Sequence, residues 1–370
     1  MKKIISAALL IALLCSLLAA CSKKDAAVSS VDEVVINLPA GETSEGEKLP
    51  LVPSSRDGRG YYLNPLTGVF DVKKDAYGKR PYAVMVSNIK AALPQWGITT
   101  PDLCYEMLAE GSITRIVAFY ADGKAIPKIG PMRSARTYHV KTALGYDSIF
   151  VHWGDSKSGN ALMVSTGLAH LDGNNLDFPR DKDRLKKKIN IEHTGYSDAS
   201  IIADNVAKKK FRTDRENKDF QAFTFNDEAE EKGISVNGAT TAATDISVTF
   251  SKDTIGTFKY NASDKLYYKG EFGAAQVDAT TKAQVAVRNV IYITDKHGYE
   301  DDKEHRTIEQ KAGVGYYFSD GQAIEIEWKK GKNADPYVFT LKDGGTLKLN
   351  PGKIWVCVVP KDTTKRLKFS

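Results

Sequence analysis

The sequence predicts an α+β protein in two parts, an N-terminal α/β layered domain at residues 59–218 and a mostly antiparallel β domain at residues 219–370. In the first part, apolar strand-like runs alternate with helix-like segments, which is typical of a layered α/β domain. In the second part, short strand-like runs follow one another between Gly, Asp and Asn turns. With 370 residues, 42% of them apolar and 26% charged, the chain is long enough for two globular domains.

The N-terminal end has the pattern of an export signal. Lys2 and Lys3 precede an almost wholly apolar run that ends in Leu-Ala-Ala before Cys21. The run is too short to suit a membrane-spanning helix, and its ending is typical of a bacterial lipobox, in which the cysteine becomes the first residue and carries lipid. We therefore predict a signal peptide at residues 1–20 and lipidation of Cys21 with acyl chains such as palmitate, which favour the bilayer by ~0.8 kcal/mol per buried methylene. The alternative is an ordinary secretory signal with an incidental cysteine.

A tether is predicted at residues 21–58, which are rich in Ser, Gly, Glu, Pro and Lys. Together with the lipidated Cys21, it would attach the protein to the lipid bilayer at the outer face of the bacterial cytoplasmic membrane. Cleavage of residues 1–20 removes two lysines and no acid, so it lowers the formal charge of +6 by two. This mild positive charge suits an anionic membrane or wall polymer, and it is not the profile of a nucleic-acid binder.

The α/β domain is predicted to alternate strands and helices, with the last two helices in succession. Strands are expected at residues 81–88, 113–121 and 148–154, and helices at residues 100–111, 134–146, 158–171 and 197–211. The helix at residues 100–111 has Thr100 as its N-cap, Pro101 in its first turn and Gly111 after its end.

The β domain is predicted from runs such as ISVTFSK, GTFKYNAS, KLYYKGEFG, VRNVIYITD, AIEIEWKK and KIWVCVVP. Cys104 and Cys357 both lie in apolar runs, so we expect buried free thiols rather than a disulfide.

Several runs, in order along the chain, carry a family resemblance. They are RPYAVMVSN, DLCYEMLAEGSITR, IGPMRSARTYHV and YDSIFVHWG in the first part, and VRNVIYI, GVGYYFSDGQAIEIEWKK and LNPGKIWVCVVP in the second. Together they resemble the YerB-like lipoproteins, a family of bacterial envelope proteins without an established activity. The resemblance implies a surface lipoprotein of two domains and says little about chemistry. The chain departs from the family pattern at Ser87, Thr137 and Asp155, where an acid, a proline and a glycine are expected.

A group of cationic donors lies in the run KIGPMRSARTYHV, residues 128–140. Arg133, Ser134 and Arg136 follow a Gly-Pro turn at the predicted start of a helix. Free backbone N–H groups at such a position, beside guanidinium groups, favour an anion such as phosphate or carboxylate. Arg115 and His193 are predicted to border the same cleft.

Internal pairing is the main alternative to a ligand site. Glu106 and Glu110 lie four residues apart, so they share one face of the helix predicted at residues 100–111. We expect them to neutralise Arg133 and Arg136 in part, and buried pairs of this kind usually orient structure rather than perform chemistry.

Two weaker patterns concern catalysis and metal binding. Ser156 follows a strand in a Gly-Asp-Ser sequence, and Asp302 and His305 have the spacing of the acid and base in SGNH-type esterases, so a serine hydrolase is a minor alternative. The simpler interpretation is that Ser156 or Ser158 caps a helix. The spacing of Glu192 and His193 is not that of a helical zinc site, and we expect neither a metal ion nor a cofactor.

The functional hypothesis is a non-catalytic binding or accessory lipoprotein of the cell envelope with an arginine-lined, anion-binding cleft in the α/β domain. Its expected partners are an anionic wall polymer, a phospholipid group or an envelope protein. The alternative is an enzyme that transfers phosphoryl or glycosyl groups on wall precursors, in which the arginines would hold a pyrophosphate.

Overall fold

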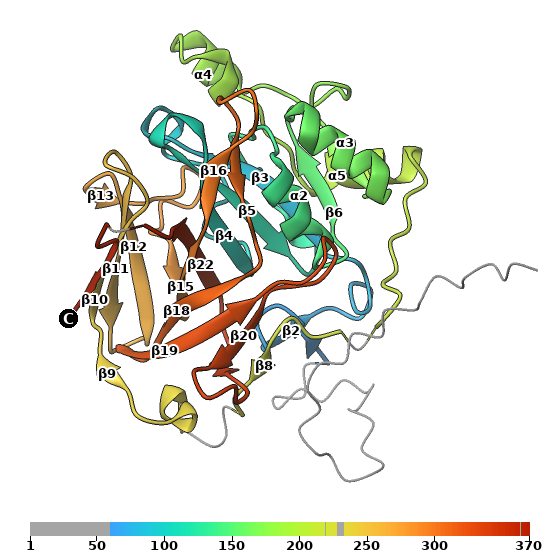
Figure 1. Ribbon diagram of the computed structural model, residues 1–370. Helices are drawn as coiled ribbons and strands as arrows, with labels where there is room; N and C mark the ends of the chain where they lie inside the picture. The colour runs from blue at the N-terminus through green and yellow to red at the C-terminus, as the bar shows by residue number, and fades with distance from the viewer. Residues whose placement is uncertain (1–59, 219, 228–232, 363) are drawn as a thin grey trace, which may run out of the picture. The chain divides into compact units, whose positions relative to one another are not determined.

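The computed structural model describes residues 60–218, 220–227, 233–362 and 364–370 (Figure 1). The predicted signal peptide, the lipidation of Cys21 and the tether lie outside the described residues. The fold is mixed, as predicted, and it contains more strand than helix.

A long sheet of eleven strands forms the centre of the described body. Its order is β20-β19-β18-β15-β22-β4-β5-β3-β6-β7, and β9 pairs with β19. The strands are β3 (Tyr82–Asn88), β4 (Leu103–Leu108), β5 (Thr114–Tyr120), β6 (Ile149–His152), β7 (His170–Asp172), β9 (Thr241–Ala242), β15 (Asn289–Asp295), β18 (Ala312–Ser319), β19 (Gln322–Lys329), β20 (Val338–Leu341) and β22 (Ile354–Pro360).

The two predicted parts of the chain share this sheet. Strand β22 pairs in parallel with β4, with Ile354 opposite Leu103. On its other side, β22 pairs in parallel with β15, while β15, β18, β19 and β20 pair antiparallel in succession. The predicted boundary at residues 218 and 219 therefore separates two sequence segments whose strands are hydrogen-bonded to each other.

A second sheet of six strands has the order β13-β12-β11-β10-β23, with β14 paired to β12. Along β11, buried and exposed residues alternate, which is the period of a strand with one solvated face. Its strands are β10 (Asp245–Thr249), β11 (Ile255–Asn261), β12 (Leu266–Glu271), β13 (Ala274–Ala275), β14 (Ala286–Val287) and β23 (Leu367–Phe369). Three separate two-stranded sheets are formed by β1 (Tyr62–Leu63) with β2 (Phe70–Val72), β16 (His297–Tyr299) with β17 (Arg306–Ile308), and β8 (Thr224–Phe225) with β21 (Lys348–Leu349).

Three of the predicted helices are confirmed in shorter form. They are α2 (Thr137–Leu144), α3 (Lys157–Thr166) and α5 (Ala199–Lys208), and a further short helix is α4 (Lys182–Lys186). Helix α3 ends before its predicted end because Gly167 adopts a left-handed conformation with φ of 64°, after which the chain continues into β7. The predicted strands at residues 81–88, 113–121 and 148–154 are confirmed as β3, β5 and β6.

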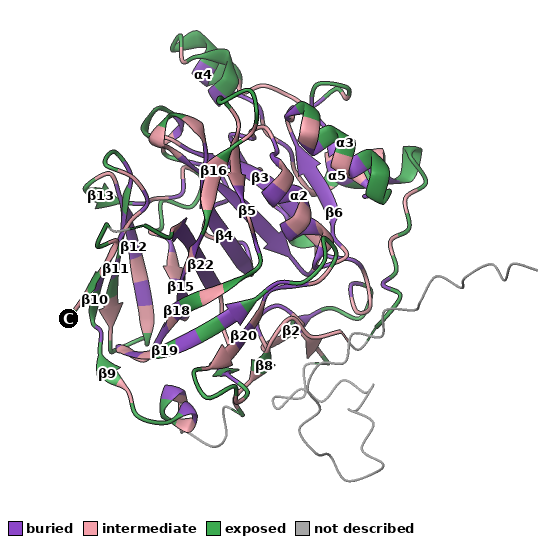
Figure 2. Cartoon of the chain, in the orientation of Figure 1, coloured by how far each residue is buried: buried purple, intermediate pink, exposed green. Residues whose placement is uncertain are grey.

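The helix predicted at residues 100–111 is wrong, because this segment forms the central strand β4. Leu103, Tyr105 and Met107 join the apolar core on one face of the long sheet, and Cys104 and Leu108 join the core on the other. Every residue of β4 is buried, as Figure 2 shows by its colour. A strand covered on both faces lacks the alternation of apolar and polar residues, so its pattern cannot be told from that of a buried helix.

The two cores show what covers each face of the long sheet. Tyr138 of α2 and Met163 of α3 belong to the same core as Tyr105. Ile202 of α5 and Phe258 of the second sheet belong to the core on the opposite face. The segment that carries the predicted arginine site, residues 128–140, leads into α2.

Candidate functional site

The chain enters α2 through an extended segment rather than through a serine cap. Arg136 is the N-cap residue, with φ of −128° and ψ of 166°, and its backbone N–H donates to Nδ1 of His139 over 3.0 Å. Ser134, which the sequence also offers as a cap at the predicted helix start, instead donates from Oγ to the carbonyl oxygen of Trp153 over 3.1 Å. Arg136 therefore lies just before the first turn of α2 rather than within it, and Ser134 joins the segment to the end of β6.

Glu110 lies between two of the predicted arginines. Arg136 donates from Nε and Nη2 to the two oxygens of Glu110 over 2.9 and 3.1 Å. Arg115 approaches the same carboxylate with Nη2 at 3.3 Å, and its Nη1 donates to the carbonyl oxygen of Ser134 over 2.9 Å. The backbone N–H of Arg306 also donates to Glu110 over 3.1 Å. This carboxylate thus holds together β5, the start of α2 and β17.

The electrostatics around Glu110 are those of a cation-rich site. Burial alone would raise the pKa of Glu110, but Arg115 and Arg136 lower it to about 2. Burial, together with the neighbouring charge of Arg136, lowers the pKa of Arg115 to about 10. One carboxylate shared between two guanidinium groups leaves an excess of positive charge.

Arg133 has a different partner from the one predicted. Its Nη1 donates to Oε2 of Glu192 over 2.6 Å, and Oε1 of Glu192 lies 3.3 Å from Nε2 of His193. Burial lowers the pKa of His193, so its ring is mainly neutral at neutral pH. Glu192 was missed as a partner, although its position beside His193 could have indicated it.

We use the name arginine cluster for Arg115, Arg133, Arg136 and Arg306 with Glu110 and Glu192. The guanidinium groups of Arg115, Arg133 and Arg136 face the two carboxylates, and Arg306 contributes a backbone N–H to Glu110. Nε of Arg115 and Nε of Arg133 are buried and make no hydrogen bond to any described residue. An N–H group of this kind favours an acceptor brought from outside.

Glu106 does not belong to the arginine cluster, which corrects the prediction. Because β4 is a strand, Glu106 points to the face of the long sheet that the second sheet covers. There it lies 3.3 Å from Nζ of Lys269 and accepts from Nε1 of Trp355 over 3.0 Å. Lys269 also forms a short contact with Glu271. Lys269 and Glu271 are two residues apart in KLYYKGEFG, so the strand period could have placed them on one face.

Asn88 connects this buried network to β3. Its Nδ2 donates to Oε1 of Glu106 over 2.8 Å and to Oγ1 of Thr114 over 2.8 Å. The network therefore links strands of both sequence segments through polar contacts inside the protein.

Ser156 is the N-cap of α3. Its Oγ accepts from the backbone N–H of Gly159 over 3.1 Å and lies 3.1 Å from Oγ of Ser158. Asp302 and His305 contact each other at 2.6 Å in the β16–β17 hairpin. Among the described residues no hydrogen bond joins Ser156 to His305, so the hydrolase hypothesis stays a prediction. The hydrogen bond from Gly159 to Ser156 supports the capping role.

Within the part of the chain that the structure describes, two groups of side chains have the composition of a cation site. The first is His152, Asp155 and Asp172, and the second is Glu300, Asp302 and His305. In the first group, both ring nitrogens of His152 are already engaged, by the carbonyl oxygen of Gly154 at 2.9 Å and by Nδ1 of His170 at 3.0 Å. In the second group, Oε1 of Glu300 accepts from Ser158 over 2.5 Å. These contacts give the side chains partners inside the protein, although the carboxylates keep further lone pairs.

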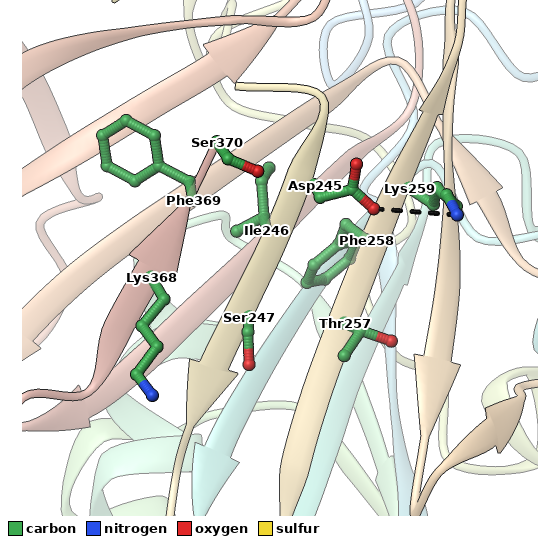
Figure 3. A pocket seen from close by; sticks show the side chains of 9 residues that line it. All are labelled: Asp245, Ile246, Ser247, Thr257, Phe258, Lys259, Lys368, Phe369 and Ser370. Atoms are coloured by element: carbon green, nitrogen blue, oxygen red, sulfur yellow. Dashed lines mark ion pairs between the residues drawn. The ribbon is translucent and has the colours of Figure 1, made fainter. Parts of the chain in front are cut away.

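A hollow of about 520 Å³ lies over β10, β11 and β23 of the second sheet (Figure 3). Asp245 and Lys259, which lie 3.9 Å apart on neighbouring strands, line it together with Lys368. Its charges are of both signs, so it does not have the excess of positive charge found in the arginine cluster.

Comparison with known proteins connects the chain to one family. The description "Protein of unknown function (DUF3048) N-terminal domain" matches residues 66–212, and the corresponding C-terminal domain matches residues 246–356. A relative from Bacillus subtilis (strain 168), named "Putative lipoprotein YerB", is 29% identical over 299 residues, which cover 80% of this chain and 86% of the relative. The crystal structure of YerB protein from Bacillus subtilis is similar with a TM-score of 0.70 and 28% identity, and the match covers 83% of this chain and 98% of that chain.

Within the described residues, no helix has both the length and the apolar character needed to cross a membrane.

Proposed function

Because the chain belongs to the YerB-like family of bacterial lipoproteins, we propose that it is an envelope lipoprotein that binds an anionic group at the arginine cluster without turning it over. The proposal includes export, lipidation of Cys21 and attachment to the outer face of the cytoplasmic membrane.

The observation that carries the proposal is the imbalance of charge and hydrogen bonding in the arginine cluster. Three guanidinium groups share two carboxylates, and Nε of Arg115 and Nε of Arg133 have no acceptor among the described residues. A phosphate or carboxylate group offers several acceptor oxygens to such donors and neutralises the remaining charge.

Arg133 is the residue through which a ligand would reach the cluster. Its side chain is 19% exposed, whereas that of Arg115 is 5% exposed. Its partner Glu192 is 43% exposed, so this pair is weakly stabilising and can open at little cost. A ligand anion would replace Glu192 as the acceptor for Arg133.

Thermal denaturation of the full chain with inorganic phosphate or pyrophosphate tests the proposal, because a bound ligand raises the melting temperature as its concentration exceeds Kd. We expect Arg133→Ala to weaken binding by about tenfold or more, since a charged hydrogen bond contributes ~1.5–3 kcal/mol. The matched control is Arg212→Ala, which removes another surface guanidinium, paired with Asp147 at 2.7 Å and with Glu216 at 3.7 Å. Equal effects of the two variants, or no shift with either anion, would contradict an anion site.

The same material distinguishes binding from catalysis. Divalent-metal-dependent release of phosphate from a lipid-linked wall precursor would support the transferase alternative and would refute the non-catalytic part of the proposal.

A further inference from the structure

A short segment at residues 180–192, which contains α4, stands out from the body at the top of Figure 1. In Figure 2 the surface of α4 is mostly coloured as exposed. Two of its apolar side chains lie in solvent, Leu185 at 41% exposure and Ile191 at 57%. An exposed large apolar side chain is common by itself, but two of them on one projecting segment require a second observation to explain them.

The second observation is the charge of the same segment. Lys182, Lys186, Lys187 and Lys188 are all exposed. Two of the three acids of the segment are paired with cations outside it, Asp181 with Lys128 at 2.5 Å and Glu192 with Arg133 at 2.6 Å. Asp183 lies 3.9 Å from Lys186, a weak surface pair. The exposed side of the segment is therefore strongly positive as well as partly apolar.

The segment is held firmly by its inner side. Arg184 is buried, and its guanidinium group donates to the carbonyl oxygens of Ala92, Pro94 and His193 over 3.0, 2.5 and 2.9 Å. The same group lies 3.9 Å from the centre of the Trp96 ring. Because Arg184 fixes the inner side of α4, Leu185 and the lysines are presented outward in a defined arrangement.

We propose that residues 180–192 form a docking surface for an anionic phospholipid bilayer. Apolar side chains flanked by lysines match the interface of such a membrane, where the former enter the boundary between headgroups and acyl chains and the latter meet the lipid phosphates. An anionic wall polymer would attract the lysines but would give Leu185 and Ile191 nothing apolar to contact. The proposal does not rest on anion binding at the arginine cluster.

The experiment rests on the proposed lipid anchor and uses the protein from Cys21 onward, anchored in vesicles of phosphatidylcholine, alone or mixed with phosphatidylglycerol. A fluorophore on Asp183→Cys reports contact with the bilayer through quenching by a headgroup-labelled lipid. Position 183 is suitable because its side chain is 82% exposed, while Cys104 and Cys357 are buried. We expect stronger quenching in vesicles that contain phosphatidylglycerol than in vesicles of phosphatidylcholine alone. This difference should disappear at high salt.

Matched variants separate this surface from general electrostatic attraction. The triple variant K186Q/K187Q/K188Q should lower the docking equilibrium on the order of 100-fold, from the known contribution of each lysine near an anionic surface. The control K208Q/K209Q/K210Q removes another exposed lysine run of the same length at the end of α5 and should leave docking unchanged. Ile191→Ser should weaken docking, whereas Val164→Ser, at a site that is 71% exposed on α3, should not.

Several outcomes would overturn the proposal. They are equal quenching in the two kinds of vesicle, equal losses in the two triple variants, and a response of the fluorophore to soluble anionic wall polymer but not to phosphatidylglycerol. Because all the substituted side chains are exposed, each variant should keep its denaturation midpoint, which serves as the folding control.

Discussion

Replacing Lys269 with methionine should destabilise the protein strongly, because it removes the cation of a buried ionic network. The side chains of Lys269 and Glu106 have no exposed area, and the two groups are 3.3 Å apart. Glu271, in short contact with Lys269, is also buried. Methionine fills a similar volume but leaves two carboxyl groups in the interior without a counter-charge. Breaking a buried pair in this way costs about 3–5 kcal/mol.

The effect should depend on pH with a definite sign. Burial, only partly offset by Lys269, raises the pKa of Glu271 from 4.5 to about 7. Between these two values the folded state holds more protons than the unfolded state, so this group lowers stability as the pH rises. Without Lys269 the pKa of Glu271 should rise further. The deficit of Lys269→Met relative to wild type should therefore be greatest at about pH 8 and smaller at about pH 5.

Urea denaturation followed by tryptophan fluorescence measures both effects, and Trp355, bonded to Glu106, provides a probe inside the network. The control is Lys259→Met on β11, where the lysine side chain is 79% exposed and the expected change is below ~0.5 kcal/mol. Adding Glu106→Gln and Glu271→Gln to Lys269→Met should restore much of the loss, because no buried charge then lacks a partner. A loss below about 1 kcal/mol, or the same loss at both pH values, would refute this account.

Three further predictions concern other side chains. Glu110→Gln should destabilise the fold at neutral pH. Because the pKa of Glu110 is lowered from 4.5 to about 2, the difference in stability from wild type should shrink as the pH falls through that range. Equal differences at all pH values in denaturation experiments would contradict this prediction. Ser156→Ala should lower the free energy of unfolding by about 1 kcal/mol through loss of the cap on α3, and Ser156→Asp should restore this stability. Labelling of Ser156 by a fluorophosphonate would instead support the hydrolase alternative. Burial raises the pKa of the thiols of Cys104 and Cys357, so a thiol reagent should label both only after denaturation, and labelling of the native protein would show this to be wrong.

The sequence by itself determined the elements whose signals are local. Predicted strands at residues 81–88, 113–121 and 148–154 appear as β3, β5 and β6, and three predicted helices appear as α2, α3 and α5. The mixed fold follows from the same patterns. These predictions succeed because strand and helix periods, Gly turns and caps act within a few residues of one another.

Only the tertiary structure determined that residues 103–108 form the strand β4 and which charged side chains pair with each other. Burial on both faces removed the alternation that would have marked residues 103–108 as a strand. Glu106 was therefore expected beside Arg136, but strand geometry turns it toward Lys269, which is 163 positions later in the chain. Arg133 found its partner Glu192 in the same way, across 59 positions. Such pairs form only when the fold brings both groups to one place, and the spacing of residues along the chain contains no information about that place.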